Sequence, residues 1–142
     1  MLKERLLDSK LSTFERYRAL FALRNINDVE ACEAVCAALN TGTDLFRHEI
    51  AFVLGQMENP VAAPALEKVL ADKTAHDMVR HEAAEALGSI CSDESLPLLK
   101  SYLADEAPAV RESCEVAMDM HDYWSAFKAN VRPGADDDSA AA

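Results

Sequence analysis

The sequence predicts an all-α protein built as an α-solenoid of about four helix–turn–helix repeats. The 142 residues are half hydrophobic, include only four glycines and five prolines, and are rich in alanine, leucine and glutamate, which favour helices. No segment keeps the alternation of apolar and polar residues that marks a strand. A short motif with arginine at its second position recurs along the chain, and an internal repeat of helix pairs is the signature of a solenoid.

The motif begins at Glu15, Phe46, Val79 and Val110, so its copies are 31, 33 and 31 residues apart. A unit contains a first helix, a break, a second apolar-periodic helix and a polar segment that closes it. The stretch VRHEAAEALGSICSDESLPLLKSYLADEAPAVR spans one complete unit and closely resembles a HEAT-type repeat. We therefore expect an α-solenoid of HEAT-type repeats.

The elements follow in order from the N-terminus. Residues 1–10 are expected to form a short amphipathic lead-in helix, and Ser12 or Thr13 is expected to cap the next helix. The predicted breaks within the units are residues 25–28, 57–60 and 91–93, and the predicted closing segments are 40–43, 72–77 and 105–108. Residues 1–130 are expected to form one HEAT-repeat domain, and the small, acidic residues 131–142 a disordered tail.

The composition argues against several classes of function. Aspartate and glutamate total 25 against 14 lysines and arginines, which gives a formal charge of -11. Nucleic acid is not expected as a partner because its phosphates need a basic surface, whereas an acidic surface suits a basic protein or serves solubility alone. No apolar run approaches the roughly 20 residues of a membrane span. Without a CxxC pair or a signal peptide, the four cysteines are expected to be small buried residues of a cytoplasmic protein.

Two His-Glu dipeptides occupy the same register of the central units, His48-Glu49 and His81-Glu82. On a helical wheel each histidine lies about 160°, and each glutamate about 260°, from the centre of the apolar stripe. Neighbouring helices pack about 8–10 Å apart, so two imidazoles that reach across this gap can share one metal. Because consecutive side chains point about 100° apart, we do not expect a histidine and the glutamate beside it to bind the same ion. Glu49 and Glu82 are instead expected to reach sideways.

Two imidazoles and a carboxylate, with open positions, form the ligand set of oxygen-activating non-haem iron. Gly55 and Gly88, one residue off the line of the histidines, are expected to clear space around the imidazoles. The outer units lack the dipeptide and carry Tyr-Arg at 17–18 and Glu-Ser at 112–113. The pairs therefore indicate a site in the central units; the other interpretation is two solvated surface dipeptides.

The other two histidines and the last aromatic residues are given structural roles. His76 and His121 are interpreted as ordinary surface residues, one in a loop and one at a helix end. Tyr123, Trp124 and Phe127 are expected to seal the last helix pair.

The segments FERYRALFALRN, LFRHEIAFVLGQM, MVRHEAAEALGSI and VRESCEVAMDM together resemble the deoxyhypusine hydroxylase family. The resemblance implies an enzyme with two facing HEAT-repeat halves whose four His-Glu motifs hold a di-iron centre. It implies hydroxylation, with molecular oxygen, of the deoxyhypusine side chain on eukaryotic translation initiation factor five A. Carried over by motif, His48, Glu49 and His81 resemble iron ligands, and Glu82 resembles a catalytic glutamate that meets the cationic substrate.

The sequence departs from that family because it offers two His-Glu motifs instead of four and resembles the C-terminal half alone. Three explanations stay open: a fragment or isolated half of a longer enzyme, completed by an N-terminal half; a free-standing half that dimerises face to face with a second copy and rebuilds four motifs by two-fold symmetry; or a pseudo-enzyme that uses the solenoid only for binding. A hypothesis from another class is a non-catalytic HEAT-repeat scaffold that binds partners along its concave face.

Overall fold

The computed structural model describes residues 1–130, and the predicted acidic tail, 131–142, lies outside the described residues. The helices are α1 (Leu2–Leu7), α2 (Thr13–Ile26), α3 (Val29–Cys36), α4 (Asp44–Met57), α5 (Ala63–Ala71), α6 (Asp77–Ile90), α7 (Leu96–Ser101) and α8 (Pro108–Asn130). Two short 3₁₀ turns, η1 (Pro60–Ala62) and η2 (Asp93–Ser95), precede α5 and α7. The described residues contain no strand, so the all-α prediction is confirmed.

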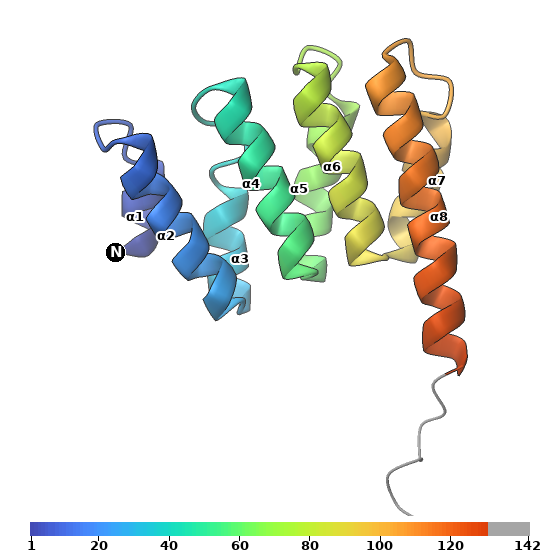
Figure 1. Cartoon of the computed structure of the whole chain (residues 1–142), viewed down its shortest axis with the longest axis horizontal. Coiled ribbons are helices and arrows are strands. Elements are labelled where there is room, and N and C mark those ends of the chain that lie inside the picture. The colour runs from blue at the N-terminus through green and yellow to red at the C-terminus, as the bar shows by residue number, and fades with distance from the viewer. Residues whose placement is uncertain (131–142) are drawn as a thin grey trace, which may run out of the picture.

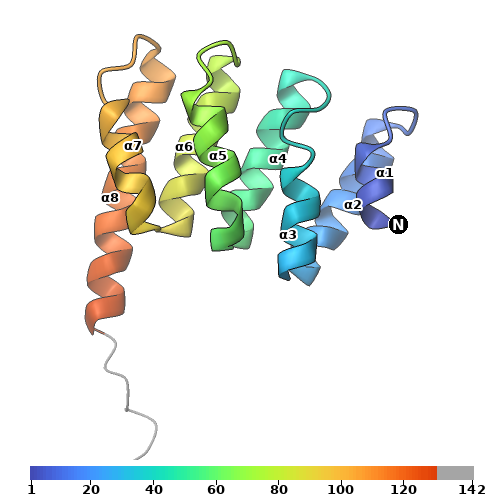
Figure 2. The ribbon, with the colours of Figure 1, turned by 180° about the vertical axis from the view of Figure 1, so that it is seen from behind.

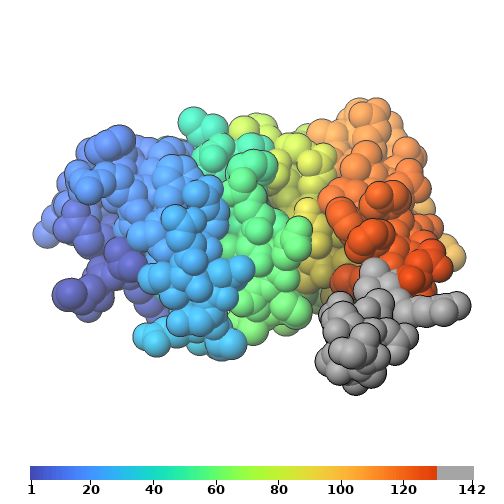
Figure 3. Space-filling model, turned by 60° about the horizontal axis from the view of Figure 1, so that its bottom comes forward, coloured from blue at the N-terminus to red at the C-terminus, as the bar shows by residue number. Residues whose placement is uncertain are grey.

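The helices form two layers. Helices α2, α4, α6 and α8 stand side by side in the front layer, and α1, α3, α5 and α7 lie behind them (Figures 1 and 2). Neighbouring front helices pack directly on one another, α2 on α4, α4 on α6 and α6 on α8. The repeats therefore follow one another in chain order along the molecule (Figure 3), which confirms the predicted solenoid of about four repeats.

Local sequence signals set the helix ends where they were expected. Ser12 caps α2 by accepting a hydrogen bond from the backbone N–H of Glu15. The first helices of three units end in a left-handed residue, namely Asn27 (φ 48°), Glu58 (φ 50°) and Cys91 (φ 59°). A left-handed residue reverses the chain after the last helical turn and is a common helix terminus. All three residues fall inside the predicted breaks.

The repeated arginines of the first three units tie α2, α4 and α6 to the helix that precedes each of them. Their Nε atoms donate to backbone carbonyls near the ends of the rear helices: Arg16 to Leu6 (2.8 Å), Arg47 to Leu39 (2.7 Å) and Arg80 to Leu70 (2.9 Å). The carbonyls at a helix C-terminus lack partners within the helix, so these bonds satisfy them. The motif that revealed the repeat is thus a structural joint between the two layers.

The hydrophobic core lies between the layers. The apolar stripe predicted for α4 is buried, as is the corresponding stripe of α6; both include fully buried residues such as Ile50, Leu54 and Val79. Cys32 and Cys114 are buried as expected, whereas the other two cysteines are partly exposed. None of the helices in residues 1–130 is both long and apolar enough to span a membrane.

The two glycines of the front layer set the spacing of its helices. A Cβ on Gly55 would lie 3.1 Å from the Cα of Ala86, and a Cβ on Gly88 would lie 2.7 Å from the Cα of Ala117. The expectation that these glycines clear space around the imidazoles is therefore wrong. They lie at helix–helix contacts, where the missing side chain lets α4 approach α6 and α6 approach α8.

Candidate metal centre

His48 and His81 face each other across the contact between α4 and α6. Their ring centroids are 5.6 Å apart and the rings are inclined by 35°. The two side chains are 21% and 25% exposed, so each imidazole is mostly covered yet open on one side. Neither histidine belongs to the apolar stripe of its helix, as the helical wheel predicted.

Glu82 joins the two imidazoles. Its Oε2 lies 3.0 Å from Nε2 of His48 and 3.5 Å from Nε2 of His81, and its side chain is 9% exposed. Each of the three residues offers a ligand atom within 4.8 Å of those of the other two. Among residues 1–130 this is the one group of three or more histidine, cysteine or acidic residues gathered so closely.

Glu49 lies on the other side of His48. Its Oε1 is 3.5 Å from Nδ1 of His48. Burial is the main cause that raises the pKa of Tyr17 on α2, and the negative charge of Glu49 is the second. The structure thus brings Glu82, rather than Glu49, to the two imidazoles. The expectation that a histidine and the following glutamate do not reach one point is wrong for His81 and Glu82. The helical angle describes how a side chain leaves the backbone, and long side chains converge again at their tips.

A simple register explains the arrangement. In the motif the histidine stands at the third place and the glutamate at the fourth. The residue at the third place of a central unit lies against the residue at the fourth place of the next unit. His48 therefore meets Glu82, and His81 meets Ser113, whose Oγ is 3.2 Å from Nδ1 of His81. No role for Ser113 was predicted from the sequence, because the fourth unit lacks the His-Glu dipeptide and was used only for comparison with the central units.

The electrostatics of Glu82 favour a bound cation. Burial raises the pKa of this carboxyl above its ordinary value, Glu85 and Glu49 add to the rise, and the two histidines oppose it. A buried carboxylate near other carboxylates is costly in its charged form unless a positive charge lies beside it. A metal ion between Glu82 and the imidazoles would supply that charge.

The residues fit a first-row transition metal. Ligands at right angles, each about 2.1 Å from a metal, lie about 3.0 Å apart, which matches the separation of 3.0 Å between His48 Nε2 and Glu82 Oε2. Nδ1 of His48 is buried and has no hydrogen-bond partner among the described residues. Imidazole and carboxylate ligands suit iron, and the exposed side of the cluster leaves positions for further ligands.

A hollow of about 200 Å³ adjoins the cluster. Phe52 and Met120 contribute apolar surface to it, and Glu58, Glu82 and Glu85 contribute carboxyl groups. Such a lining suits a flexible chain that carries positive charge. The hollow lies between α4, α6 and α8, on the same face as the imidazoles.

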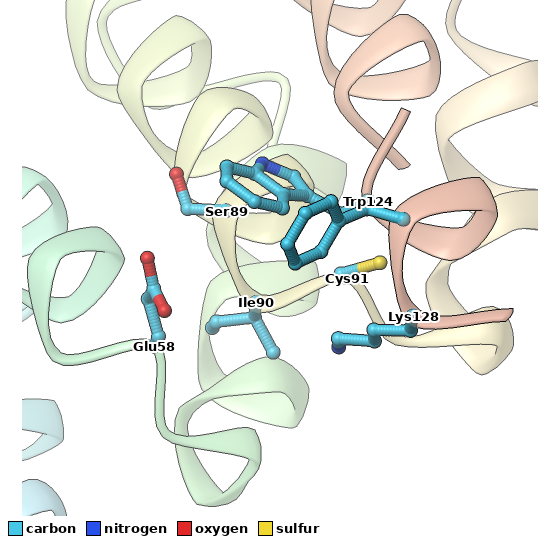
Figure 4. A pocket seen from close by; sticks show the side chains of 7 residues that line it. Glu58, Ser89, Ile90, Cys91, Trp124 and Lys128 are labelled. Atoms are coloured by element: carbon cyan, nitrogen blue, oxygen red, sulfur yellow. The ribbon is translucent and has the colours of Figure 1, made fainter. Parts of the chain in front are cut away.

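A second cavity, of about 260 Å³, shares Glu58 and Ser89 with this hollow and lies beside it. Figure 4 shows Trp124 and Cys91 on its wall. Tyr123, Trp124 and Phe127 are 65%, 40% and 54% exposed, so the expectation that they seal the last helix pair is wrong. Helix α8 extends beyond α7, which leaves these aromatic rings without a rear helix to pack on.

The remaining histidines differ from each other. His76 is exposed and caps α6 by accepting a hydrogen bond from the backbone N–H of Met78, in agreement with its interpretation as a surface residue. His121 is buried within α8, and its Nε2 lies 2.8 Å from Oδ1 of Asp93. Its interpretation as a surface residue at a helix end is wrong, because α8 continues nine residues further and packs His121 against the corner before α7.

Comparison with known proteins agrees with this architecture. The family model for HEAT repeats matches residues 2–78 and 73–119. The chain belongs to the HEAT-repeat family. This HEAT-repeat chain is 50% identical over 124 residues to deoxyhypusine hydroxylase of Mus musculus, covering 87% of the chain and 41% of the relative. It is 56% identical over 122 residues to deoxyhypusine hydroxylase of Candida albicans, covering 86% of the chain and 38% of the relative.

A solved structure of human deoxyhypusine hydroxylase in complex with glycerol superposes on the HEAT-repeat chain with a TM-score of 0.84 at 49% identity. The match covers 86% of this chain and 42% of the human chain. The chain thus spans about two fifths of the length of the relatives it matches. The resemblance to one half of deoxyhypusine hydroxylase is confirmed.

Proposed function

We propose that this chain is one half, the C-terminal one, of a deoxyhypusine hydroxylase, an iron-dependent monooxygenase of the cytoplasm. Its substrate is the deoxyhypusine side chain of eukaryotic translation initiation factor five A. The observation that carries the proposal is the cluster of His48, His81 and Glu82 on the open face of the front helices. Identities of 49–56% to proteins of that name support it.

In this proposal His48 and His81 would hold iron through the nitrogens that face Glu82, and the Glu82 carboxylate would be a third ligand. The bound iron supplies the reaction with oxygen that an unactivated carbon–hydrogen bond requires. Glu82 thereby takes the metal-binding role that sequence comparison gave to Glu49. Glu49 reaches toward α2, where it is free to meet substrate or a facing surface.

The acidic hollow beside the cluster holds the substrate side chain. A polyamine has methylene groups between its ammonium groups, so it needs apolar contact and negative charge along one path. Phe52 and Met120 offer the apolar contact, and Glu58 and Glu85 offer the charge. Glu82 lines both the hollow and the metal cluster, so a side chain bound in the hollow would lie next to the iron site.

A di-iron centre needs more ligands than this chain supplies, because three close donors leave most positions of two metals open. We propose that a facing N-terminal half, or a second copy of the chain related by a two-fold axis, supplies them. One chain by itself is then expected not to hold an iron pair.

The test is anaerobic loading with Fe(II), with iron per chain measured by mass spectrometry and the oligomeric state by sedimentation. A tightly bound iron pair in a strict monomer would overturn the proposal that the site is incomplete. Hydroxylation of the deoxyhypusine-bearing factor is then measured with and without the N-terminal half. A chain that stays colourless in air and inactive with that half is a scaffold.

A matched pair of variants tests the ligand assignment. Glu82→Ala is expected to abolish iron binding, and Glu49→Ala to retain most of it, because only Glu82 lies at both imidazoles. The two variants remove the same group from equivalent places of adjacent repeats. Loss of iron from Glu49→Ala alone would restore the assignment made from sequence.

A further inference from the structure

Ser113 of the fourth repeat contacts the metal cluster from outside it. Its side chain is buried, with the residue 5% exposed, and its Oγ lies 3.2 Å from Nδ1 of His81. The same Oγ lies 3.3 Å from Oε1 of Glu85, one helical turn beyond His81 on α6. His81, Ser113 and Glu85 therefore form a chain of hydrogen bonds that leads from the cluster to the surface.

The chemistry of these groups fixes the direction of the protons. A carboxylate only accepts hydrogen bonds, so the Ser113 hydroxyl donates its single hydrogen to Glu85. Toward His81 the hydroxyl oxygen can then only accept, so the hydrogen between them belongs to Nδ1 of the imidazole. In a neutral imidazole one nitrogen carries the hydrogen and the other carries the lone pair. Nε2, which faces Glu82 and His48, thus carries the lone pair that a metal needs.

We propose that Ser113, held by Glu85, is a positioning residue that fixes His81 as the Nδ1-protonated tautomer and presents its Nε2 to the metal. The link to iron rests on the proposed function, whereas the tautomer is a property of the chain without metal. With the lone pair at Nε2, two acceptors, His81 Nε2 and Glu82 Oε2, face each other at 3.5 Å. A cation between them relieves their repulsion.

The two imidazoles of the cluster are not equivalent in this respect. Nδ1 of His48 has no hydrogen-bond partner among the described residues, whereas Nδ1 of His81 has the Ser113 hydroxyl. The register accounts for the difference, because the place after the histidine holds Glu82 in the third repeat and Ser113 in the fourth. The fourth repeat thereby orients a ligand of the site without supplying one.

The test starts from metal-free chain labelled with ¹⁵N in its histidines. Long-range proton–nitrogen correlation spectra, recorded about two pH units above the ordinary histidine pKa of about 6.5, report which ring nitrogen carries the hydrogen. His81→Gln identifies the signals of this residue. Wild-type His81 is expected to be protonated at Nδ1. Ser113→Ala is expected to move the hydrogen toward Nε2, the form favoured in water, and Ser113→Thr to restore Nδ1 because it keeps the hydroxyl.

Two further variants guard the result against a loss of folding. Glu85→Ala removes the carboxylate that accepts the Ser113 hydrogen bond. The Glu85 side chain is 40% exposed, so its loss leaves the core unchanged, and the preference of His81 for the Nδ1-protonated tautomer is expected to weaken. Ser89→Ala is the matched control. The Ser89 hydroxyl lies on the same helix but donates to the backbone carbonyl of Glu85, so its removal should leave the tautomer of His81 unchanged. Protonation of wild-type His81 at Nε2, or a Ser113→Ala spectrum like that of wild type, would overturn the proposal.

Fe(II) affinity, measured anaerobically by competition with a chelator, gives the second readout. Loss of a group that orients a metal-binding histidine weakens metal binding by about 10–100-fold, so this is the loss expected for Ser113→Ala, with Thr restoring affinity. Equal affinity in wild type and Ser113→Ala would overturn the link to the metal. If neither wild type nor any variant binds Fe(II), even with the N-terminal half present, while His81 shows Nδ1 protonation, the iron function fails and the relay stands.

Discussion

Gly88→Ala is the sharpest test of the close packing between α6, which carries two residues of the cluster, and α8, which packs beside it. The new Cβ would lie 2.7 Å from the Cα of Ala117, a backbone atom that cannot rotate away. Ordinary contact begins at 3.4 Å, so α8 has to move by about 0.7 Å. At Gly55 the corresponding distance to the Cα of Ala86 is 3.1 Å, and a shift of about 0.3 Å is enough. The two substitutions therefore form a matched pair with different clashes.

The magnitude follows from two opposing effects. Alanine in place of glycine inside a helix stabilises it by about 1 kcal/mol, which applies to both variants. Overpacking costs about 1–3 kcal/mol and is expected near the upper end at Gly88, where the clash is with backbone. Gly88→Ala should therefore lower the free energy of unfolding by about 1–2 kcal/mol, and Gly55→Ala should change it by less than about 1 kcal/mol.

Guanidinium unfolding, followed by circular dichroism and by fluorescence, measures these changes as shifts of the midpoint at constant slope. The single tryptophan, Trp124, lies in α8 and reports on the helix that moves. A Gly88→Ala protein as stable as wild type, or more stable than Gly55→Ala, would refute the close approach of α6 and α8. Since α8 also carries Ser113, Gly88→Ala should in addition weaken the contact with His81.

Two further predictions concern the site and the buried ion pair. His48→Ala and His81→Ala should each abolish iron binding while the protein stays folded. Leu54→Ala, in the core, should instead lower the free energy of unfolding by about 2–5 kcal/mol. Iron analysis and circular dichroism measure the two effects, and a histidine variant that unfolds as severely as Leu54→Ala would rule out the site interpretation. The hydrogen bonds from Arg80 lower the pKa of Asp105 in the folded protein. The pair therefore stabilises the fold fully above the pKa of aspartate in the unfolded chain, about 3.9, and this stabilisation is lost as the pH falls through the lower pKa of the folded state. The stability difference between wild type and Asp105→Asn, measured by denaturant unfolding, should therefore be largest near neutral pH and shrink below about pH 4, and a difference independent of pH would contradict the role of the pair.

The cluster of His48, His81 and Glu82 follows from how the repeats are stacked. Each of the two central repeats contributes a histidine that points toward the next front helix and a glutamate that points back toward the previous one. Two adjacent copies therefore suffice to bring His48, Glu82 and His81 together, and the cluster needs no loop or insertion. The open front face is where the proposed second half would complete the site.

The sequence by itself determined the helices, their ends and the repeat. Periodicity within each segment fixes the apolar stripe, and cap and break residues such as Ser12 and Asn27 act over a few residues, so local chemistry is enough. The sequence also placed both histidines off the core stripe and in matching register. These features depend on intervals along one helix or between copies of one motif.

Only the tertiary structure decided which groups meet. A helical wheel gives the direction of Glu82 or Glu49 but not which helix lies in that direction or how close it is, because both depend on the packing of neighbouring repeats. The packing brought Glu82 to the imidazoles, placed Ser113 behind His81, and buried His121 under the corner before α7. It also gave Gly55 and Gly88 their role, since a helix contact of this kind exists only once two repeats are stacked.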